Sequence, residues 1–151
     1  MIKNFIFDID GTLLDSNDFH AQAWVEAFAA YGKTIPFKRV RPCMGEGADQ
    51  LLPEFLDKKE VKEIGQDLSK LCGEIFRQKY FPKVRPFLKV RALFKKIRQS
   101  GARIALASSA DTGEVKKHEK KSHTFKIWWN IPRRQMMPIN LNLLRIFFML
   151  S

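Results

Sequence analysis

The sequence predicts an α/β protein: a doubly wound parallel sheet, incomplete in this chain, with an inserted all-helical segment. Three observations lead to this prediction. An apolar strand over residues 2–8 runs directly into an acidic turn, and a second apolar strand over residues 102–107 ends in two serines. Helical periodicity fills the sequence between the two strands. A helix that returns to a strand is the order of elements found in parallel α/β sheets.

The first helical region begins at Asn17, where the spacing of apolar residues changes from that of a strand. The apolar residues that recur at helical spacing are Phe19, Ala23, Trp24, Ala27, Phe28 and Tyr31. Gly32 predicts the end of this helix. A flexible turn is expected over residues 45–49, and Pro53 suits the first turn of a short helix.

A longer helix is predicted over residues 58–80. Its apolar face consists of Val61, Ile64, Leu68, Leu71, Ile75 and Phe76. Stripes of this kind usually form a core rather than contact a cofactor. We therefore expect residues 16–83 to form an all-helical cap, inserted between the two parts of the sheet.

The α/β core is expected to resume at residue 84. Residues 88–99 predict an amphipathic helix that ends at Ser100 and Gly101. The residues expected to face the sheet are Val90, Leu93, Phe94 and Ile97. Residues 1–15 and 84–118 together then form a partial α/β core.

Asp8 and Asp10 lie two residues apart where the first strand ends, so their side chains point the same way. Open parallel sheets bind their ligands at this end of their strands. Two acids so close together are costly unless a cation or a shared proton relieves the repulsion. The pair therefore indicates either a magnesium site or a nucleophile beside a general acid/base. An acidic turn without chemistry is the alternative, because Asp-Gly is common in turns.

The whole string from Phe5 to Ser16 resembles the first motif of the haloacid dehalogenase (HAD) superfamily of phosphohydrolases, and the resemblance extends over residues 1–118. More narrowly, the chain is similar to the helical-cap branch, which includes sugar-phosphate phosphatases and β-phosphoglucomutase. The resemblance implies a Rossmann-like core and Mg²⁺, with Asp8 and Asp10 as metal ligands. It also implies that Asp8 forms an aspartyl-phosphate, that Asp10 protonates the leaving oxygen and later activates water, and that Thr12 holds the phosphoryl group.

Ser108 and His20 are further candidates for substrate binding. A Ser-Ser pair at a strand end is more often a turn or a helix cap, but the family has Ser or Thr at the position of Ser108, and we expect it to bind the phosphoryl group. His20 matches a position near the acid/base in β-phosphoglucomutase-like members. Packing beside Phe19 and Trp24 explains that histidine equally well. Arg41 could meet an anionic substrate, although a water-facing position is the more common one.

The function expected from these residues is hydrolysis of small phosphate monoesters such as sugar phosphates. A phosphomutase is the alternative within the family, favoured if His20 orients the acid/base and the phosphoenzyme resists water. An alternative of another class is a basic protein that binds nucleic acid through its tail and has no enzymatic activity. A nonfunctional pseudogene product is the remaining alternative.

Charge and composition restrict these choices further. The formal charge of +11 divides into +6 over residues 1–118 and +5 over residues 119–151. A moderately basic body suits a protein that binds anionic phosphoesters, and no nucleic-acid motif is present, so no nucleic acid is expected. Asp8 interrupts the apolar start before it could serve as a secretory signal, and no membrane-spanning segment is evident. Two distant cysteines read as reduced thiols of a cytoplasmic protein.

The family pattern ends abruptly after His118. A Lys-Pro segment and a further acidic pair are expected there, to neutralise the phosphoryl group and to hold magnesium. One permitted back-translation of residues 133–148, read from the third base of its first codon, gives Thr-Thr-Asp-Asp-Ala-Asp-Lys-Ser-Lys-Pro. We therefore expect residues 119–151 to be an out-of-frame tail and this truncated chain to fold marginally, with little or no activity. Residues 143–150 would pack on the open sheet or cause aggregation.

Overall fold

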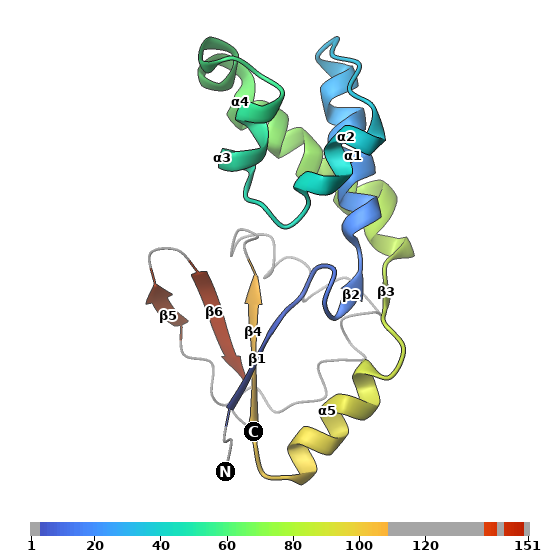
Figure 1. Ribbon diagram of the computed structural model, residues 1–151, viewed down its shortest axis with the longest axis vertical. Coiled ribbons are helices and arrows are strands. Elements are labelled where there is room, and N and C mark those ends of the chain that lie inside the picture. Colours follow the sequence, from blue (N-terminus) through green and yellow to red (C-terminus); the bar gives the residue numbers. More distant parts are fainter. Residues whose placement is uncertain (1–3, 109–137, 142–143, 150–151) are drawn as a thin grey trace. The chain divides into compact units, whose positions relative to one another are not determined.

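The computed structural model describes residues 4–108, 138–141 and 144–149 of the chain (Figure 1). Of residues 105–108 and of the two later segments, only the backbone is described. The chain divides into two compact units. The first combines Met1–Asp15 with Arg85–Ser151, and the second is Ser16–Val84.

The first unit contains a sheet with the strand order β1-β4-β6-β5. β1 (Asn4–Asp8) and β4 (Arg103–Ser108) are parallel and aligned so that Asp8 lies opposite Ala107. The predicted α/β class is therefore confirmed, and the two predicted strands are parallel neighbours in the sheet. The second predicted strand is displaced by one residue at each end, because it begins at Arg103 and includes Ser108.

Two antiparallel strands that were not predicted from the sequence complete this sheet. β6 (Leu144–Met149) pairs with the free edge of β4, and β5 (Pro138–Leu141) pairs with β6. An apolar strand at the edge of a sheet exposes unpaired backbone groups that another strand can satisfy. The apolar tail segment expected to pack on the open sheet thus lies beside β4.

One face of the sheet is covered by α5 (Val90–Gln99). Ile97, Ala102 and Ile104 form a buried cluster, against which Phe5, Phe7 and Phe94 pack. The rings of Phe7 and Phe94 lie 5.4 Å apart, between their centroids. Because side chains alternate along a strand, Ile6 points to the other face of β1, and it is 55% exposed.

The start and the inner face of α5 differ from the prediction. The helix begins at Val90 rather than at residue 88, and Leu88 is 94% exposed. Leu93, predicted to face the sheet, is 43% exposed. In an α-helix Leu93 lies about 60° around the axis from Val90, whereas Ile97 lies only about 20° from it. Leu93 is therefore at the margin of the buried stripe.

A short ribbon connects the chain of the first unit to the inserted segment. β2 (Leu14–Asp15) and β3 (Arg85–Pro86) are antiparallel, with Leu14 opposite Pro86 and Asp15 opposite Arg85. The backbone N–H of Phe87 extends this pairing by donating to the carbonyl of Leu13 at 3.0 Å. The chain therefore leaves and re-enters the first unit along two adjacent strands.

The elements of the second unit are all helical. In chain order they are α1 (Asn17–Ala30), α2 (Phe37–Val40), η1 (Arg41–Cys43), α3 (Ala48–Leu51), η2 (Leu52–Glu54), α4 (Lys58–Ile75), η3 (Phe76–Tyr80) and η4 (Phe81–Lys83). The long helix predicted over residues 58–80 is an α-helix only to Ile75, and η3 continues it as a π-helical turn. Gly32 has a φ of +72°, as expected of a glycine that ends a helix.

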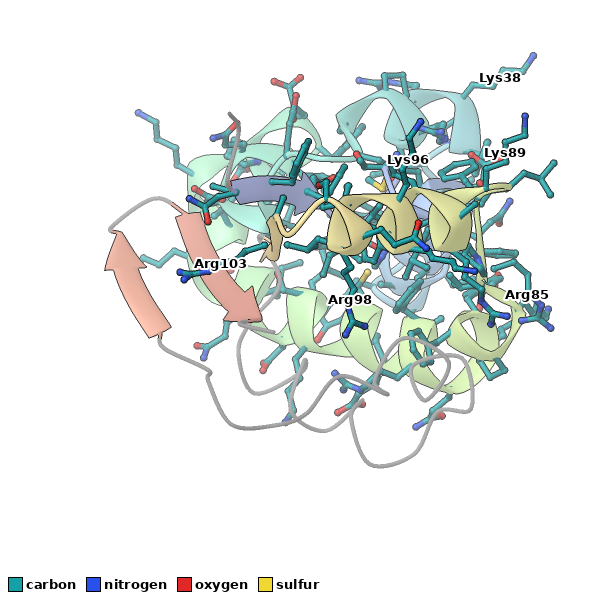
Figure 2. All side chains as sticks on the ribbon, turned by 90° about the horizontal axis from the view of Figure 1, so that it is seen from below. Lys38, Arg85, Lys89, Lys96, Arg98 and Arg103 are labelled. Atoms are coloured by element: carbon teal, nitrogen blue, oxygen red, sulfur yellow. The ribbon has the colours of Figure 1, made fainter. Side chains whose placement is uncertain are left out.

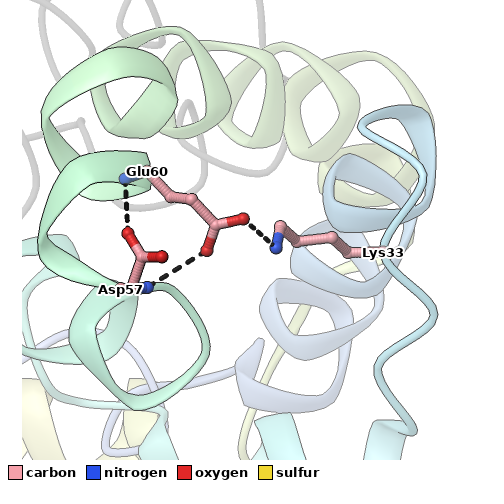
Figure 3. A network of polar contacts seen from close by, with 3 residues as sticks. All are labelled: Lys33, Asp57 and Glu60. Carbon is pink, nitrogen blue, oxygen red and sulfur yellow. Dashed lines mark hydrogen bonds and ion pairs between the residues drawn. The ribbon is translucent and has the colours of Figure 1, made fainter.

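Aromatic packing and a polar clamp hold α1 and α4 in this unit. The Phe28 side chain is fully buried, and its ring lies 5.7 Å from that of Trp24 and 5.4 Å from that of Phe55. Asp57 caps α4: its carboxylate accepts from the Glu60 N–H at 2.8 Å, and Glu60 accepts from the Asp57 N–H at 3.1 Å (Figure 3). The Lys33 ammonium donates to Glu60 at 2.5 Å.

Candidate active site

A tight turn after β1 places the candidate catalytic residues. The N–H groups of Leu13 and Leu14 both donate to the carbonyl of Ile9 at 2.9 Å, and the Gly11 N–H donates to the carbonyl of Leu14 at 2.8 Å. Gly11 has a φ of +74°, a conformation that costs glycine little. The side chains of Leu13 and Leu14 are buried, so the turn is anchored by its apolar end.

Asp8 and Thr12 meet across this turn. The Thr12 hydroxyl donates to Oδ2 of Asp8 at 3.2 Å, and both side chains are exposed. In the described part of the chain, Oδ1 of Asp8 has no hydrogen-bond donor. The turn therefore fixes one carboxylate oxygen and leaves the other available for chemistry.

Asp10 lies inside the same turn. It is half-buried, and its backbone forms a bridge with Leu14. Asp10 also makes a further interaction within the protein. Asp8 thus ends β1, and Asp10 follows it in the backbone-bonded turn.

Ser108 is the last residue of β4. Because Ala107 is opposite Asp8 in the parallel register, Ser108 stands one position beyond Asp8 on the neighbouring strand. The carboxyl ends of the two strands therefore share one edge of the sheet, where α/β proteins bind ligands. The backbone brings Asp8, Thr12 and Ser108 to this edge. Residues 109–118 lie outside the described residues.

His20 and Arg41 belong to the second unit. The His20 ring stacks on the ring of Phe76, with centroids 3.7 Å apart and an angle of 13° between the planes. Packing therefore accounts for at least part of its environment. Arg41 forms an ion pair with Asp18, so an exposed carboxylate of the same unit already meets its guanidinium.

A polar cluster around Glu26 was not predicted from the sequence. The Glu26 carboxylate accepts hydrogen bonds from Lys79 at 2.6 Å and from the Tyr80 hydroxyl. Burial alone would raise the pKa of Glu26, but these two donors and nearby lysine charges together lower it. Burial, then the hydrogen bond to Glu26 and the Glu26 charge, raise the pKa of Tyr80. These residues are more than fifty positions apart, so no local sequence pattern could have revealed the cluster.

The carboxylates of Asp8 and Asp10 are suitable ligands for magnesium. Magnesium prefers oxygen donors, and it commonly takes one or two protein carboxylates while it keeps several waters. Among the residues that the structure describes, no group of three or more His, Cys, Asp or Glu side chains could hold a metal. The exposed Asp8 and the nearby Asp10 can supply the one or two carboxylates that such a site requires.

Comparison with known proteins identifies the family. A family model described as haloacid dehalogenase-like hydrolase matches residues 5–127. The chain therefore belongs to the haloacid dehalogenase-like hydrolases. It is 31% identical over 127 residues to the candidate phosphatase YhcW of Bacillus subtilis (strain 168), an alignment that covers 83% of this chain and 57% of YhcW.

Solved structures support the fold. A haloacid dehalogenase-like family hydrolase of Streptococcus pneumoniae matches with a TM-score of 0.65 and 22% identity, over 79% of this chain and 55% of that one. A candidate phosphoglycolate phosphatase of Lactobacillus plantarum matches with a TM-score of 0.68 and 19% identity, over 83% of this chain and 59% of that one. The chain spans little more than half the length of these relatives.

Proposed function

We propose that this chain carries the first part of a magnesium-dependent phosphatase site for small phosphate monoesters such as sugar phosphates. The observation that supports this most directly is the hydrogen bond from Thr12 to Asp8, at the sheet edge that Ser108 shares. Membership of the haloacid dehalogenase-like hydrolases supports the reaction class.

Asp8 is the proposed nucleophile. Its Oδ1 attacks phosphorus, so that a new P–O bond forms while the bond to the ester oxygen breaks. Thr12 holds Oδ2 and thereby orients the attack, and it binds the phosphoryl group together with Ser108. Magnesium, held by Asp8 and Asp10, would neutralise phosphoryl charge.

Asp10 is the proposed general acid and base. It gives its proton to the departing ester oxygen and then takes a proton from the water that attacks the aspartyl-phosphate. Phosphate leaves and the Asp8 carboxylate is restored. If a second sugar hydroxyl took the place of that water, the same site would act as a phosphomutase. His20 remains a candidate for orienting Asp10 in that alternative, and measuring isomerised product beside released phosphate separates the two activities.

A shift of reading frame near His118 remains our proposal for residues 119–151. Some letters of the shifted reading are independent of codon choice: Met136-Met137-Pro138 forces Asp and then Ala, and Trp128-Trp129-Asn130 forces Val and then Glu. Sequencing the locus across the codons of His118 and Glu119 tests the proposal. Codons for residues 133–148 that yield no Lys-Pro in any frame would rule it out.

Phosphatase turnover with magnesium, compared between this chain and its frame-restored version, tests the function. We expect the frame-restored chain to release phosphate from sugar phosphates only with magnesium, and the present chain to release little or none. Asp8→Asn should reduce turnover of the frame-restored chain to background. Undiminished turnover in that variant would exclude Asp8 as the nucleophile, and a nucleic-acid complex unaffected by the substitution would favour the nonenzymatic alternative.

A further inference from the structure

The segment from β3 to the start of β4 is strongly basic. It carries seven basic side chains and no acidic one: Arg85, Lys89, Arg91, Lys95, Lys96, Arg98 and Arg103. All seven are exposed. Within the described residues, the six from Lys89 onward form no ion pair or hydrogen bond through their side chains. No described acidic group therefore neutralises these six charges by direct contact.

The arrangement of α5 turns its own four cations outward: Arg91, Lys95, Lys96 and Arg98. Val90, Phe94 and Ile97 face the sheet, so the remaining circumference of the helix is left to the basic residues. Figure 2 shows Lys89 and Lys96 along one side of α5 and Arg98 on the other. We call this outward face, together with residues 87–89, the α5 basic surface.

Exposed apolar side chains accompany the charges. Phe87 is 40% exposed, Leu88 94% and Leu93 43%, and these are three of the five large exposed hydrophobic residues in the described part of the chain. Leu88 directly precedes Lys89, whose φ of +69° separates it from the helix. Leu88 therefore contributes little to the core, and its contact with an apolar layer of a partner would be favourable.

We propose that the α5 basic surface docks on the surface of a membrane rich in anionic phospholipid. Lipid phosphates match the cations spread over the outward face of α5, and the adjoining acyl region accommodates Leu88 and Leu93. Nucleic acid would satisfy the cations but offers no apolar layer to these leucines. No helix among the described residues is long and apolar enough to span a bilayer.

Flotation of the full chain with lipid vesicles tests this proposal, because flotation separates bound protein from aggregates. We expect binding to vesicles that contain phosphatidylserine, no binding to pure phosphatidylcholine vesicles, and release by salt. Changing Arg91, Lys95 and Lys96 together to Gln should lower the partition coefficient on the order of 100-fold, about fivefold per cation. Gln has nearly the helix propensity of Lys and Arg, so α5 is retained.

The matched control removes the same charge from the second unit, by changing the exposed Lys38, Lys58 and Lys62 to Gln. This control should bind as the parent chain does, whereas Leu88→Ser should bind about tenfold more weakly. An equal loss in the control, or equal binding to neutral vesicles, would overturn the proposal. Binding of a single-stranded oligonucleotide without binding of vesicles would also overturn it, and would assign the surface to nucleic acid.

Discussion

Lys89 occupies a backbone conformation that suits glycine. Among the described residues it is the one residue other than glycine with a positive φ, +69°. A side chain in this left-handed region costs about 1–2 kcal/mol, because Cβ approaches the following carbonyl oxygen. This conformation allows the chain to turn from residues 87–88 into α5. The surrounding structure must therefore stabilise it against its local strain.

Replacing Lys89 with Gly should therefore stabilise the protein. We expect the free energy of unfolding to rise by about 1 kcal/mol, since the strain is removed at a residue outside the helix interior. Urea denaturation measures this change. Lys95→Gly, within α5, is the control and should lower the free energy of unfolding by about 0.5–1 kcal/mol. A destabilised Lys89→Gly protein would contradict this account.

Thr12 is predicted to act through its hydrogen bond to a charged oxygen of Asp8. Such bonds contribute about 1.5–3 kcal/mol, so Thr12→Val should lower kcat/KM of the frame-restored enzyme about 10- to 100-fold. Thr12→Ser keeps the hydroxyl and serves as the control, with nearly parental activity. Equal losses in the two variants would show that the hydroxyl is not what matters.

At the scale of the element, the amino end of α4 depends on a reciprocal pair of bonds between Asp57 and Glu60 (Figure 3). These bonds satisfy N–H groups that have no partner within the helix. Asp57→Ala should lower the free energy of unfolding by about 1 kcal/mol. Asp57→Ser retains a capping oxygen, so a loss of the same size in that variant would argue against capping as the cause.

Glu60 makes this element sensitive to acid. The hydrogen bond from Lys33, followed by that from the Asp57 N–H, lowers the pKa of Glu60. A folded-state pKa below the unfolded value gives stability that is present above the usual Glu range, about 4.3, and lost as pH falls through the folded pKa. The stability difference between the parent chain and Glu60→Gln should therefore shrink on acidification. Chemical denaturation at several pH values measures it, and a difference independent of pH would refute the assignment.

Periodicity predicted the long elements well but not their ends. α1 and α4 follow from apolar residues at helical spacing, and their buried residues include Phe28 and Leu68. The change from α-helix to π-helix at Phe76 gives no comparable signal, because a π-helical turn inserts one residue without altering composition. α5 starts late because Lys89 adopts a left-handed conformation that lysine rarely does.

At the scale of the whole molecule, the first motif places Asp8 at the end of β1 and Asp10 and Thr12 in the turn after it. Asp8 and Thr12 lie close in sequence, so their contact follows from a single turn. Ser108 reaches the same edge only through strand pairing, which the helix-to-strand order implied. The contacts of Glu26 and the antiparallel pairing of β5 and β6 depend on tertiary packing. They could not be predicted from local sequence patterns.

The sheet also affects the solution behaviour of the whole chain. Ile6 is 55% exposed on the face of β1 opposite α5, where an α/β sheet normally carries a second layer of helices. Ile6→Thr keeps a β-branched residue and should reduce light scattering of concentrated protein without lowering its melting temperature. Tyr31→Ser, at the 37% exposed Tyr31 of the second unit, is the control. Equal reductions in both variants would indicate a nonspecific effect.

The two-stranded ribbon of β2 and β3 makes the inserted helices exchangeable. Asp15 and Arg85 are paired across the two strands, so the insertion starts and ends at one pair of opposed residues. The length of the insertion is therefore not constrained by the register of the main sheet. The inserted segment could be lengthened, shortened or replaced as one unit. An Asn-Gly dipeptide placed between Asp15 and Arg85 would join the two strands as a β-hairpin.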